Sequence, residues 1–499
     1  MKGIIYLVMG LFFAAFTSCK EDLGSYDYVD TDIVQIDTTG MGSTYRIIRL
    51  SNLKISPKIR VPEGHNGTYQ WLLYAKQTSN NSSMNSKEIS DRPDLDVVIA
   101  EPIGEYVAEL IVTDQTTGIK SNVTFNVSVT ANMEFGMMIL YQGSAGGDVD
   151  FIRTPALSST ITEKTHVKGL YSLSMGKPLS GQAKFIWSAY QAFQITNWIT
   201  LGSDNYLARF KGGDFTFIRD QEDIYRRRET EINPQAYVYN SNSLHVLVNG
   251  KKLHVTGNGF YESDIKFPGA VDGNYEVAPY LVQRHASAFS TIAYDQKNGR
   301  FIRYYLSNNS IGDFAQPTPG QLFSLRNVGK DMLYMCNGAS NYTYAFFKDK
   351  TGNGRWMHVI DFTKSVDGGD LAVGMYDMAA LPEIEQAKYY QVSGFGGFAY
   401  YATRDKIYNY AYRNANTASV AFQVPAGEEI TCMRFYKPIP NIRVTDKEER
   451  VLYVATWNGT AGKVYELALN ETSGVISSNP VSTFEVGGRV VDMAARATN

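Results

Sequence analysis

The sequence predicts an all-β protein in which a small β-sandwich precedes a β-propeller of six to seven blades. Three observations support this prediction. Tyr (34), Phe (25) and Gly (43) are abundant, which favours strands and turns over helices. Short apolar runs are separated by turns rich in Gly, Asn and Asp. Beyond about residue 132, a unit of apolar strand, turn and aromatic-rich strand recurs roughly every 45–60 residues, a spacing typical of repeat architectures.

Residues 45–131 carry the pattern of the sandwich. In the stretch "GEYVAELIVTD", Val107, Glu109, Ile111 and Thr113 fall on one face of a strand and Ala108, Leu110 and Val112 on the other. A turn at 114–118 follows, and the next strand alternates in the same way from Val123 to Val129. This strand spacing and turn density predict a small immunoglobulin-like sandwich.

Residues 132–499 carry the propeller repeats. Examples are "GMMILYQGSAGGDVDFI", "LHVLVNGKKLHVTG", "YAFFKDKTGNGRWMHVIDF" and "VLYVATWNGTAGKVYELALN". The competing interpretation is two or three further β-sandwiches. That interpretation does not explain why the same strand, turn and aromatic strand recur so often, so a β-propeller is favoured.

The N-terminus predicts an export signal over residues 1–18. Lys2 supplies a positive charge, and the apolar run 4–16 is too short for a membrane span of about 20 residues. Small residues then precede Cys19, which resembles a bacterial lipobox, although Phe16 stands where Leu is commonest. This resemblance implies lipid attachment at Cys19. The alternative is an ordinary signal peptide followed by a chance cysteine.

Residues 19–44 are expected to form the lipid anchor, a tether and a first strand. Lys20, Glu21 and Asp22 directly follow the cysteine and resemble the signal that exports Bacteroidetes lipoproteins to the cell surface. A solvated tether would also be charged, so that alternative stays open. The expected location is the outer membrane, with the lipid-anchored protein facing the exterior.

The chain as a whole resembles the PKD-like lipoproteins of Bacteroidetes, which combine an N-terminal PKD-like domain with a C-terminal propeller. The resemblance rests on the lipobox, on Tyr26-Asp27-Tyr28, on the double strand 104–130, and on segments 136–152 and 452–470. Trp71-Leu72-Leu73 departs from the Trp-Asp-Phe-Gly-Asp core of ordinary PKD domains. The resemblance implies an accessory of SusC/SusD-type uptake systems.

That resemblance also implies the partners. They are outer-membrane lipid through Cys19, a TonB-dependent transporter with its SusD-like lid, and an external glycan or peptide as ligand. No nucleic-acid partner is expected, because the formal net charge of −3 gives no bias toward polyanions.

The motifs of catalysis and metal binding are missing from the sequence, so no catalytic residue, metal or cofactor is predicted. The stretch "DKTGNG" at 349–354 begins like a calcium loop, but Ile360 stands where the bidentate carboxylate should be, so a hairpin turn is expected. Cys336 and Cys432 are expected to be buried thiols, with a single disulfide as the alternative. A non-enzymatic binding protein is therefore predicted, and the alternative is a propeller-fold glycoside hydrolase or polysaccharide lyase.

Aromatic side chains near predicted loop ends are the best candidates for ligand binding. Tyr and Trp can stack on sugar rings or peptide side chains and still hydrogen-bond at one edge. Propeller blades are also packed with aromatics, so a core role is the alternative for each. The candidates are Trp198, Tyr206, Tyr342, Trp356, Tyr376, Phe395 and Trp457.

Overall fold

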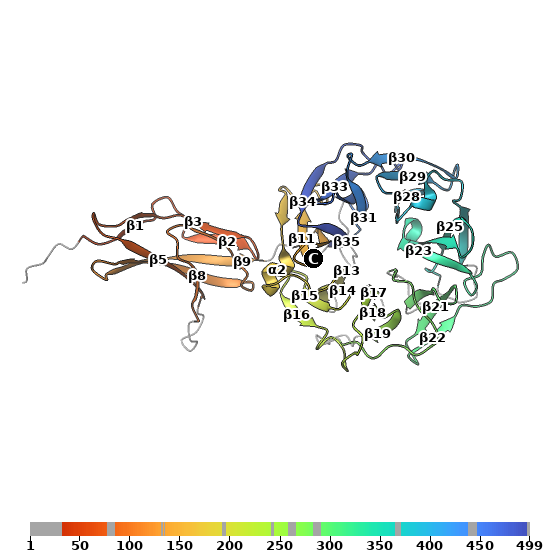
Figure 1. The fold of residues 1–499 in the computed structure, drawn as a ribbon, viewed down its shortest axis with the longest axis horizontal. Coiled ribbons are helices and arrows are strands. Elements are labelled where there is room, and N and C mark those ends of the chain that lie inside the picture. Colours follow the sequence, from red (N-terminus) through yellow and green to blue (C-terminus); the bar gives the residue numbers. More distant parts are fainter. Residues whose placement is uncertain are drawn as a thin grey trace, which may run out of the picture. The chain divides into compact units, whose positions relative to one another are not determined.

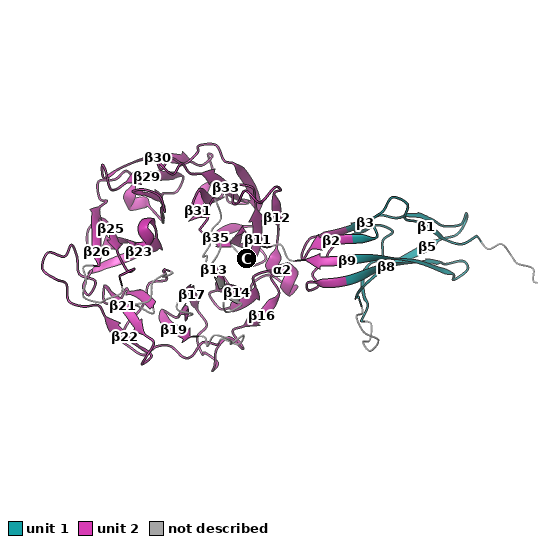
Figure 2. Cartoon of the chain, turned by 180° about the vertical axis from the view of Figure 1, so that it is seen from behind, with its two compact units in different colours: residues 1–44, 54–96, 106–126 teal, residues 45–53, 97–105, 127–499 magenta. Residues whose placement is uncertain are grey.

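The computed structural model describes residues 32–76, 85–130, 133, 135–191, 196–240, 244–257, 266–282, 291–364, 371–437 and 447–496. The predicted lipid-attachment residue Cys19 and the export residues Lys20, Glu21 and Asp22 lie outside them. The chain divides into two compact units, residues 1–44, 54–96 and 106–126, and residues 45–53, 97–105 and 127–499 (Figure 2). The described helices include none that is long and apolar enough to span a membrane.

The N-terminal strands form the predicted sandwich. Its main sheet has the order β2-β9-β8-β5-β6, and β1 pairs with β4 and β3 with β7. The strands are β1 (Gln35–Asp37), β2 (Thr44–Ile48), β3 (Asn52–Ile55), β4 (Lys58–Arg60), β5 (Gly67–Ala75), β6 (Lys87–Ser90), β7 (Leu95–Val98), β8 (Gly104–Asp114) and β9 (Lys120–Thr130).

The sandwich core confirms the alternation seen in the sequence. Ala108, Leu110 and Val112 of β8, which the pattern placed on one face, are buried. Trp71 of β5 is fully buried, and its ring stacks on Phe125 of β9 with 6.0 Å between centroids. The Trp71 indole N–H donates to the Arg92 carbonyl at 3.0 Å, so the one polar atom of this side chain is satisfied.

The second unit contains a β-propeller. Among the described residues its strands form seven small antiparallel sheets, and Figure 1 shows these blades arranged as a ring. This confirms the predicted fold class. The ring is closed in blade 1, where β35, the last strand, hydrogen-bonds to β10, the first. Because the two ends of the ring share one sheet, opening the ring requires breaking a strand ladder.

The blades are numbered here in chain order. Blade 1 is β10 (Gly136–Gln142), β11 (Gly147–Arg153), β12 (Thr165–Val167) and β35 (Arg489–Arg496); blade 2 is β13 (Ala183–Gln191), β14 (Thr196–Ser203), β15 (Leu207–Lys211) and β16 (Phe217–Asp220); blade 3 is β17 (Pro234–Asn240), β18 (Leu244–Asn249) and β19 (Lys252–Gly257); blade 4 is β20 (Thr291–Asp295), β21 (Arg300–Tyr305) and β22 (Ser310–Asp313).

Blades 5 to 7 each have four strands. Blade 5 is β23 (Lys330–Asn337), β24 (Thr343–Asp349), β25 (Arg355–Ile360) and β26 (Ala372–Asp377); blade 6 is β27 (Tyr389–Val392), β28 (Phe398–Ala402), β29 (Lys406–Ala411) and β30 (Thr417–Gln423); blade 7 is β31 (Glu429–Phe435), β32 (Val451–Trp457), β33 (Gly462–Ala468) and β34 (Ser482–Val486). The short helices are α2 (Leu170–Met175), η2 (Ala339–Asn341) and η3 (Ile384–Gln386).

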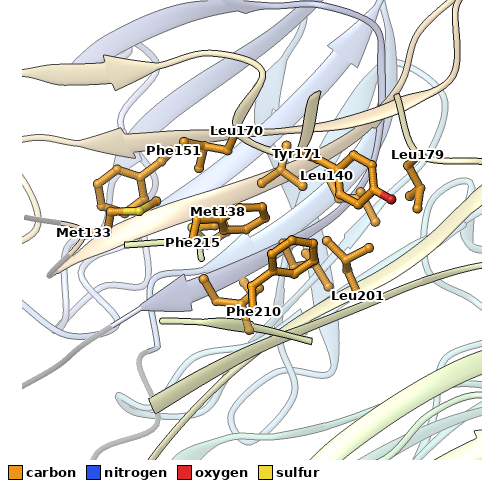
Figure 3. Close-up of a cluster of buried hydrophobic side chains, with 14 of the residues drawn as sticks. Met133, Met138, Leu140, Phe151, Leu170, Tyr171, Leu179, Leu201, Phe210 and Phe215 are labelled. Atoms are coloured by element: carbon orange, nitrogen blue, oxygen red, sulfur yellow. The ribbon is translucent and has the colours of Figure 1, made fainter. Parts of the chain in front are cut away.

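Packing between blades explains the aromatic composition. In β24, Tyr344 and Phe346 enter the core shared with blade 6, whereas Ala345 and Phe347 enter the core shared with blade 4. Both faces of a blade are therefore buried, and its middle strands read as continuous apolar runs rather than as an alternation. Figure 3 shows one such core, where Leu140 of β10, Phe151 of β11 and Phe210 of β15 converge.

Candidate functional site

The central cavity of the propeller is the candidate functional site. It encloses about 1310 Å³, which is large enough for an oligosaccharide or a short peptide. Blades 1, 2, 3, 5, 6 and 7 contribute to its wall, together with residues 279–282, which precede the first strand of blade 4. The main lining segments lie within residues 491–495, 184–188, 233–237, 279–282, 334–341, 388–395 and 432–437.

Four side chains from different blades form a hydrogen-bonded group in this wall, called here the polar cluster: Tyr334, Gln391, Arg434 and Asp492. Arg434 Nη1 donates to the Tyr334 hydroxyl at 2.5 Å, and Arg434 Nη2 donates to Asp492 Oδ1 at 2.8 Å. Gln391 Nε2 also donates to the Tyr334 hydroxyl, at 3.0 Å. The other oxygen of Asp492, Oδ2, accepts the backbone N–H of Ile186 at 3.1 Å. The four side chains come from blades 5, 6, 7 and 1, and the bond from Ile186 connects the cluster to blade 2 as well.

The local sequence explains why Arg434 faces the cavity. Its neighbours Met433 and Phe435 are buried in the apolar core between blades 6 and 7. Successive side chains of a strand point to opposite faces, so Arg434 is directed away from that core. Its side chain keeps 31% of its surface exposed, whereas that of Asp492 keeps 12%. The guanidinium is therefore accessible, while the carboxylate that holds it is nearly covered.

Charge and burial shift the pKa values of two members of the cluster, Arg434 and Tyr334. Burial alone would lower the pKa of Arg434, but the neighbouring Tyr334 and Asp492 raise it well above its ordinary value. Burial raises the pKa of Tyr334 above its ordinary value of 10. At neutral pH the site therefore presents a guanidinium cation and a protonated phenol, and Tyr334 has no tendency to act as a tyrosinate base.

Aromatic side chains form the apolar part of the wall. Tyr280 lies edge-to-face against Tyr334, with 5.3 Å between ring centroids. Trp187, Tyr389 and Phe395 also line the cavity and are only partly buried. Burial raises the pKa of Tyr389 to about 12, so this phenol is also neutral. These rings offer flat surfaces beside the polar cluster, as in sites that bind sugars or peptides.

Two adjacent acids, Glu448 and Glu449, lie in another part of the wall. Lys437 forms an ion pair with Glu449. Burial and the neighbouring Glu449 raise the pKa of Glu448 to about 7. One acid is thus held by a cation and the other titrates near neutrality, a difference that also occurs between catalytic carboxylates.

Cys336 and Cys432 also line the cavity and are free thiols, as predicted, but only Cys432 is buried, whereas Cys336 is half-buried. Burial raises the pKa of each thiol to about 12. Because only the thiolate is a good nucleophile, neither group is suited to nucleophilic attack at neutral pH.

The structure does not bring the predicted aromatic binding residues together. Only Phe395 lines the cavity. Trp198 is buried in blade 2, with the Arg209 guanidinium 4.3 Å from its ring. The Tyr206 hydroxyl donates to Asp220 at 3.3 Å, and Trp356 donates through its indole N–H to Asp349 at 3.1 Å.

The other predicted aromatics are also dispersed. Tyr342 and Tyr376 pack against the core between blades 5 and 6, and Trp457 lies partly buried at the end of β32. A binding role for these residues therefore stays a prediction.

The stretch 349–354 forms the turn of the β24–β25 hairpin, as predicted, with Gly352 at φ 86°. A side chain would be strained at that angle, so glycine suits this position. Within the described ranges, no group of three or more His, Cys, Asp or Glu side chains is arranged to hold a metal ion.

The sequence reasoning missed the polar cluster, although a signal was present. Arg434 and Asp492 are charged residues inside otherwise apolar strands, "EITCMRF" and "RVVDMAAR". A charge in such a strand must find a partner or a polar space, because burying it alone is costly. In a propeller, the open space available to an inner strand is the central cavity.

The comparisons agree with the two regions of the fold. The sequence profile of the PKD-like family matches residues 19–183. This match includes the sandwich and β10–β12 of blade 1, and it ends at Ala183, where blade 2 begins. Among the curated proteins, none matches this sequence.

A quinonprotein alcohol dehydrogenase-like protein from Bacteroides thetaiotaomicron is similar in structure over 92% of this chain and 98% of its own, with a TM-score of 0.51 and 12% identity. Hsv2 from Kluyveromyces lactis matches over 76% of this chain and 95% of its own, with a TM-score of 0.37 and 9% identity. At these identities the likeness to the first protein concerns the fold alone.

Proposed function

We propose that this chain is a lipid-anchored protein of the outer cell surface that binds an external nutrient, a glycan or a peptide, in the central cavity of its propeller. It would present this nutrient to a TonB-dependent transporter with a SusD-like lid. The observation that carries the proposal is the 1310 Å³ cavity, whose wall combines aromatic rings with a fixed group of polar side chains. Such a combination of apolar surface and few convergent polar groups is typical of ligand sites.

The surface location rests on the sequence. The apolar run ending at Cys19, followed by Lys20, Glu21 and Asp22, supports a lipid anchor that is exported to the outer face. Replacement of Cys19 by Ser should release the protein from the membrane fraction. Replacement of residues 20–22 by Ala should keep the protein in the membrane fraction but protect it from externally added protease, because it would no longer reach the outer face. Retention of the Cys19→Ser protein in the membrane would contradict the anchor.

The binding function can be tested with glycan and peptide arrays, followed by calorimetric titration of the best ligand. Loss of a stacking ring, in Tyr389→Ala, should weaken binding by about two- to tenfold. The matched control is Tyr305→Ala, which removes a partly buried tyrosine ring outside the cavity lining and should leave the affinity unchanged. If Tyr305→Ala weakens binding and Tyr389→Ala does not, the cavity is not the binding site.

Glu448 and Glu449 favour a second candidate function, a glycoside hydrolase or polysaccharide lyase. A carboxyl group with a pKa of about 7, beside an acid that is paired with Lys437, could serve as a general acid or base. Release of reducing ends or unsaturated products from a polysaccharide, abolished in Glu448→Gln, would support this candidate. Stable binding without product release would support the binding protein.

A further inference from the structure

The inference concerns the ligand of the central cavity and therefore rests on the proposed function. The polar cluster offers more hydrogen-bond donors than acceptors to that cavity. A guanidinium carries five N–H groups. Those of Arg434 that have acceptors among the described residues bond to the Tyr334 hydroxyl, to Asp492 and, at 3.4 Å, to the Met433 carbonyl. The Nε–H and the second Nη2–H have no acceptor within the described chain, so they are available to a ligand.

The Tyr334 hydroxyl is a further donor. Its oxygen accepts two hydrogen bonds, from Arg434 at 2.5 Å and from Gln391 at 3.0 Å. Because both neighbours donate, the hydroxyl proton must be directed elsewhere. The described residues provide no acceptor for it. A ligand atom that bonds to this hydroxyl must therefore be an acceptor, such as a carboxylate oxygen.

Asp492 does not compete for these donors. One of its oxygens accepts from Arg434 and the other accepts from the backbone of Ile186. These two bonds fix the guanidinium in place before any ligand arrives. Asp492 is therefore a positioning residue, and such preorganisation reduces the entropy lost on binding.

The net charge of the cavity wall is positive, like the charge of Arg434. Five cationic residues line the cavity, Lys184, Lys388, Arg434, Lys437 and Arg450, against the three acids Glu448, Glu449 and Asp492. The net charge of the lining is thus +2 with every acid ionised, in a chain whose formal charge is −3. A cavity whose sign opposes that of the whole chain favours anionic ligands over neutral ones.

We propose that the ligand carries a carboxylate, whose oxygens accept hydrogen bonds from the free N–H groups of Arg434 and from the hydroxyl of Tyr334. The rings of Tyr280 and Tyr389 then contact the apolar part of the ligand next to its carboxylate. Acidic sugars and peptide C-termini share this chemistry, and the experiment below separates the two sources.

The test is calorimetric titration of the full-length protein with two matched pairs of probes. One pair is an oligogalacturonate and its neutral methyl ester, and the other is a short peptide with a free C-terminal carboxylate and the same peptide amidated. The acidic member of one pair should bind about tenfold to a hundredfold more tightly than its neutral partner, as expected for charge-assisted hydrogen bonds. The pair that shows the difference identifies the source of the carboxylate.

Two variants assign this difference to the cluster. Arg434→Gln should abolish the preference for the acidic probe. Tyr334→Phe, which removes only the hydroxyl, should reduce the preference while keeping the fold, and it gives an answer even if Arg434→Gln does not fold. The matched control is Arg300→Gln: Arg300 also pairs with aspartates, at 3.2 and 2.6 Å, and its side chain is similarly exposed (27%), but it lies outside the cavity lining. This control should bind like the wild type.

The outcomes separate the two proposals. If acidic and neutral probes bind equally well and Tyr334→Phe changes nothing, the carboxylate inference is wrong while the binding function stands. If an acidic preference persists in both cluster variants, the carboxylate is bound elsewhere and the inference is also wrong. If no member of either pair binds, both the inference and the proposed function are overturned for these ligand classes.

Discussion

Tyrosine hydroxyls inside the blades and at the cavity wall are satisfied in opposite ways. Within the blades, Tyr400 donates to the Gly474 carbonyl and Tyr401 to the Pro382 carbonyl, each at 2.6 Å. At the cavity wall, the Tyr334 hydroxyl accepts from Arg434 and Gln391, and its own proton has no acceptor among the described residues. The difference indicates that the blade hydroxyls stabilise the fold, whereas the Tyr334 hydroxyl is held ready for a ligand.

The largest expected effect is on the stability of the fold, when a blade hydroxyl and the Tyr334 hydroxyl are each removed. Tyr275, which lies between the strands of blades 3 and 4 in the chain and is buried in their shared core, donates to the Val271 carbonyl at 2.7 Å and accepts the Leu253 N–H at 3.2 Å. Tyr275→Phe leaves both backbone groups without this partner, so we expect a loss of about 1–3 kcal/mol in the free energy of unfolding. Tyr334→Phe should cost less, about 0.5–1 kcal/mol, because its partners face the cavity and can bond to water.

Thermal and denaturant unfolding of the two variants, measured side by side, checks this prediction. Both substitutions remove one oxygen atom and nothing else, so each is a control for the other. If Tyr334→Phe is destabilised as strongly as Tyr275→Phe, the two hydroxyls contribute equally to the stability of the fold. That result would contradict the distinction between blade hydroxyls and the Tyr334 hydroxyl.

A smaller effect is expected from pH. Glu448 has a pKa raised to about 7, so it is mostly neutral at pH 6 and mostly ionised at pH 8. The cavity wall gains one negative charge over this range. An anionic probe should therefore bind about twofold more weakly at pH 8 than at pH 6, as expected for unit charges that interact across solvent.

Three other titratable groups in the wall, two thiols and one phenol, do not contribute to this pH dependence of binding. Burial raises the pKa of Cys336, Cys432 and Tyr389 to about 12, so they stay protonated between pH 6 and 8. Glu448→Gln should make the affinity independent of pH in this window, measured by the same titration with an oligogalacturonate. A variant that keeps the wild-type pH dependence would show that another group is responsible.

The fold was predictable from sequence because it depends on local patterns. The alternation in 104–130 indicated the two strands β8 and β9 and their two faces, and the repeated strand, turn and aromatic strand indicated the blades. The turn at 349–354 was recognised from Gly and Asn alone, since those residues adopt tight turns readily. The strand pair, the turn and each single repeat unit are contained within about 30 residues, and the propeller followed from the recurrence of that unit along residues 132–499.

The candidate site was not predictable in the same way. Tyr334, Gln391, Arg434 and Asp492 are separated by up to 158 positions in the sequence and meet only when four inner strands surround one cavity. The aromatics selected from sequence were chosen by their nearness to loops. That criterion does not distinguish a ring in a blade core, such as Trp198, from one at the cavity wall, such as Phe395.

The central claim is that the cavity binds a carboxylate through Arg434 and Tyr334. The most direct measurement is a crystal structure of the protein with the acidic probe that binds best. The account predicts that the probe lies in the cavity with its carboxylate oxygens about 3 Å from an Arg434 nitrogen and from the Tyr334 hydroxyl. A probe bound outside the cavity, or one whose carboxylate points into solvent, would contradict it.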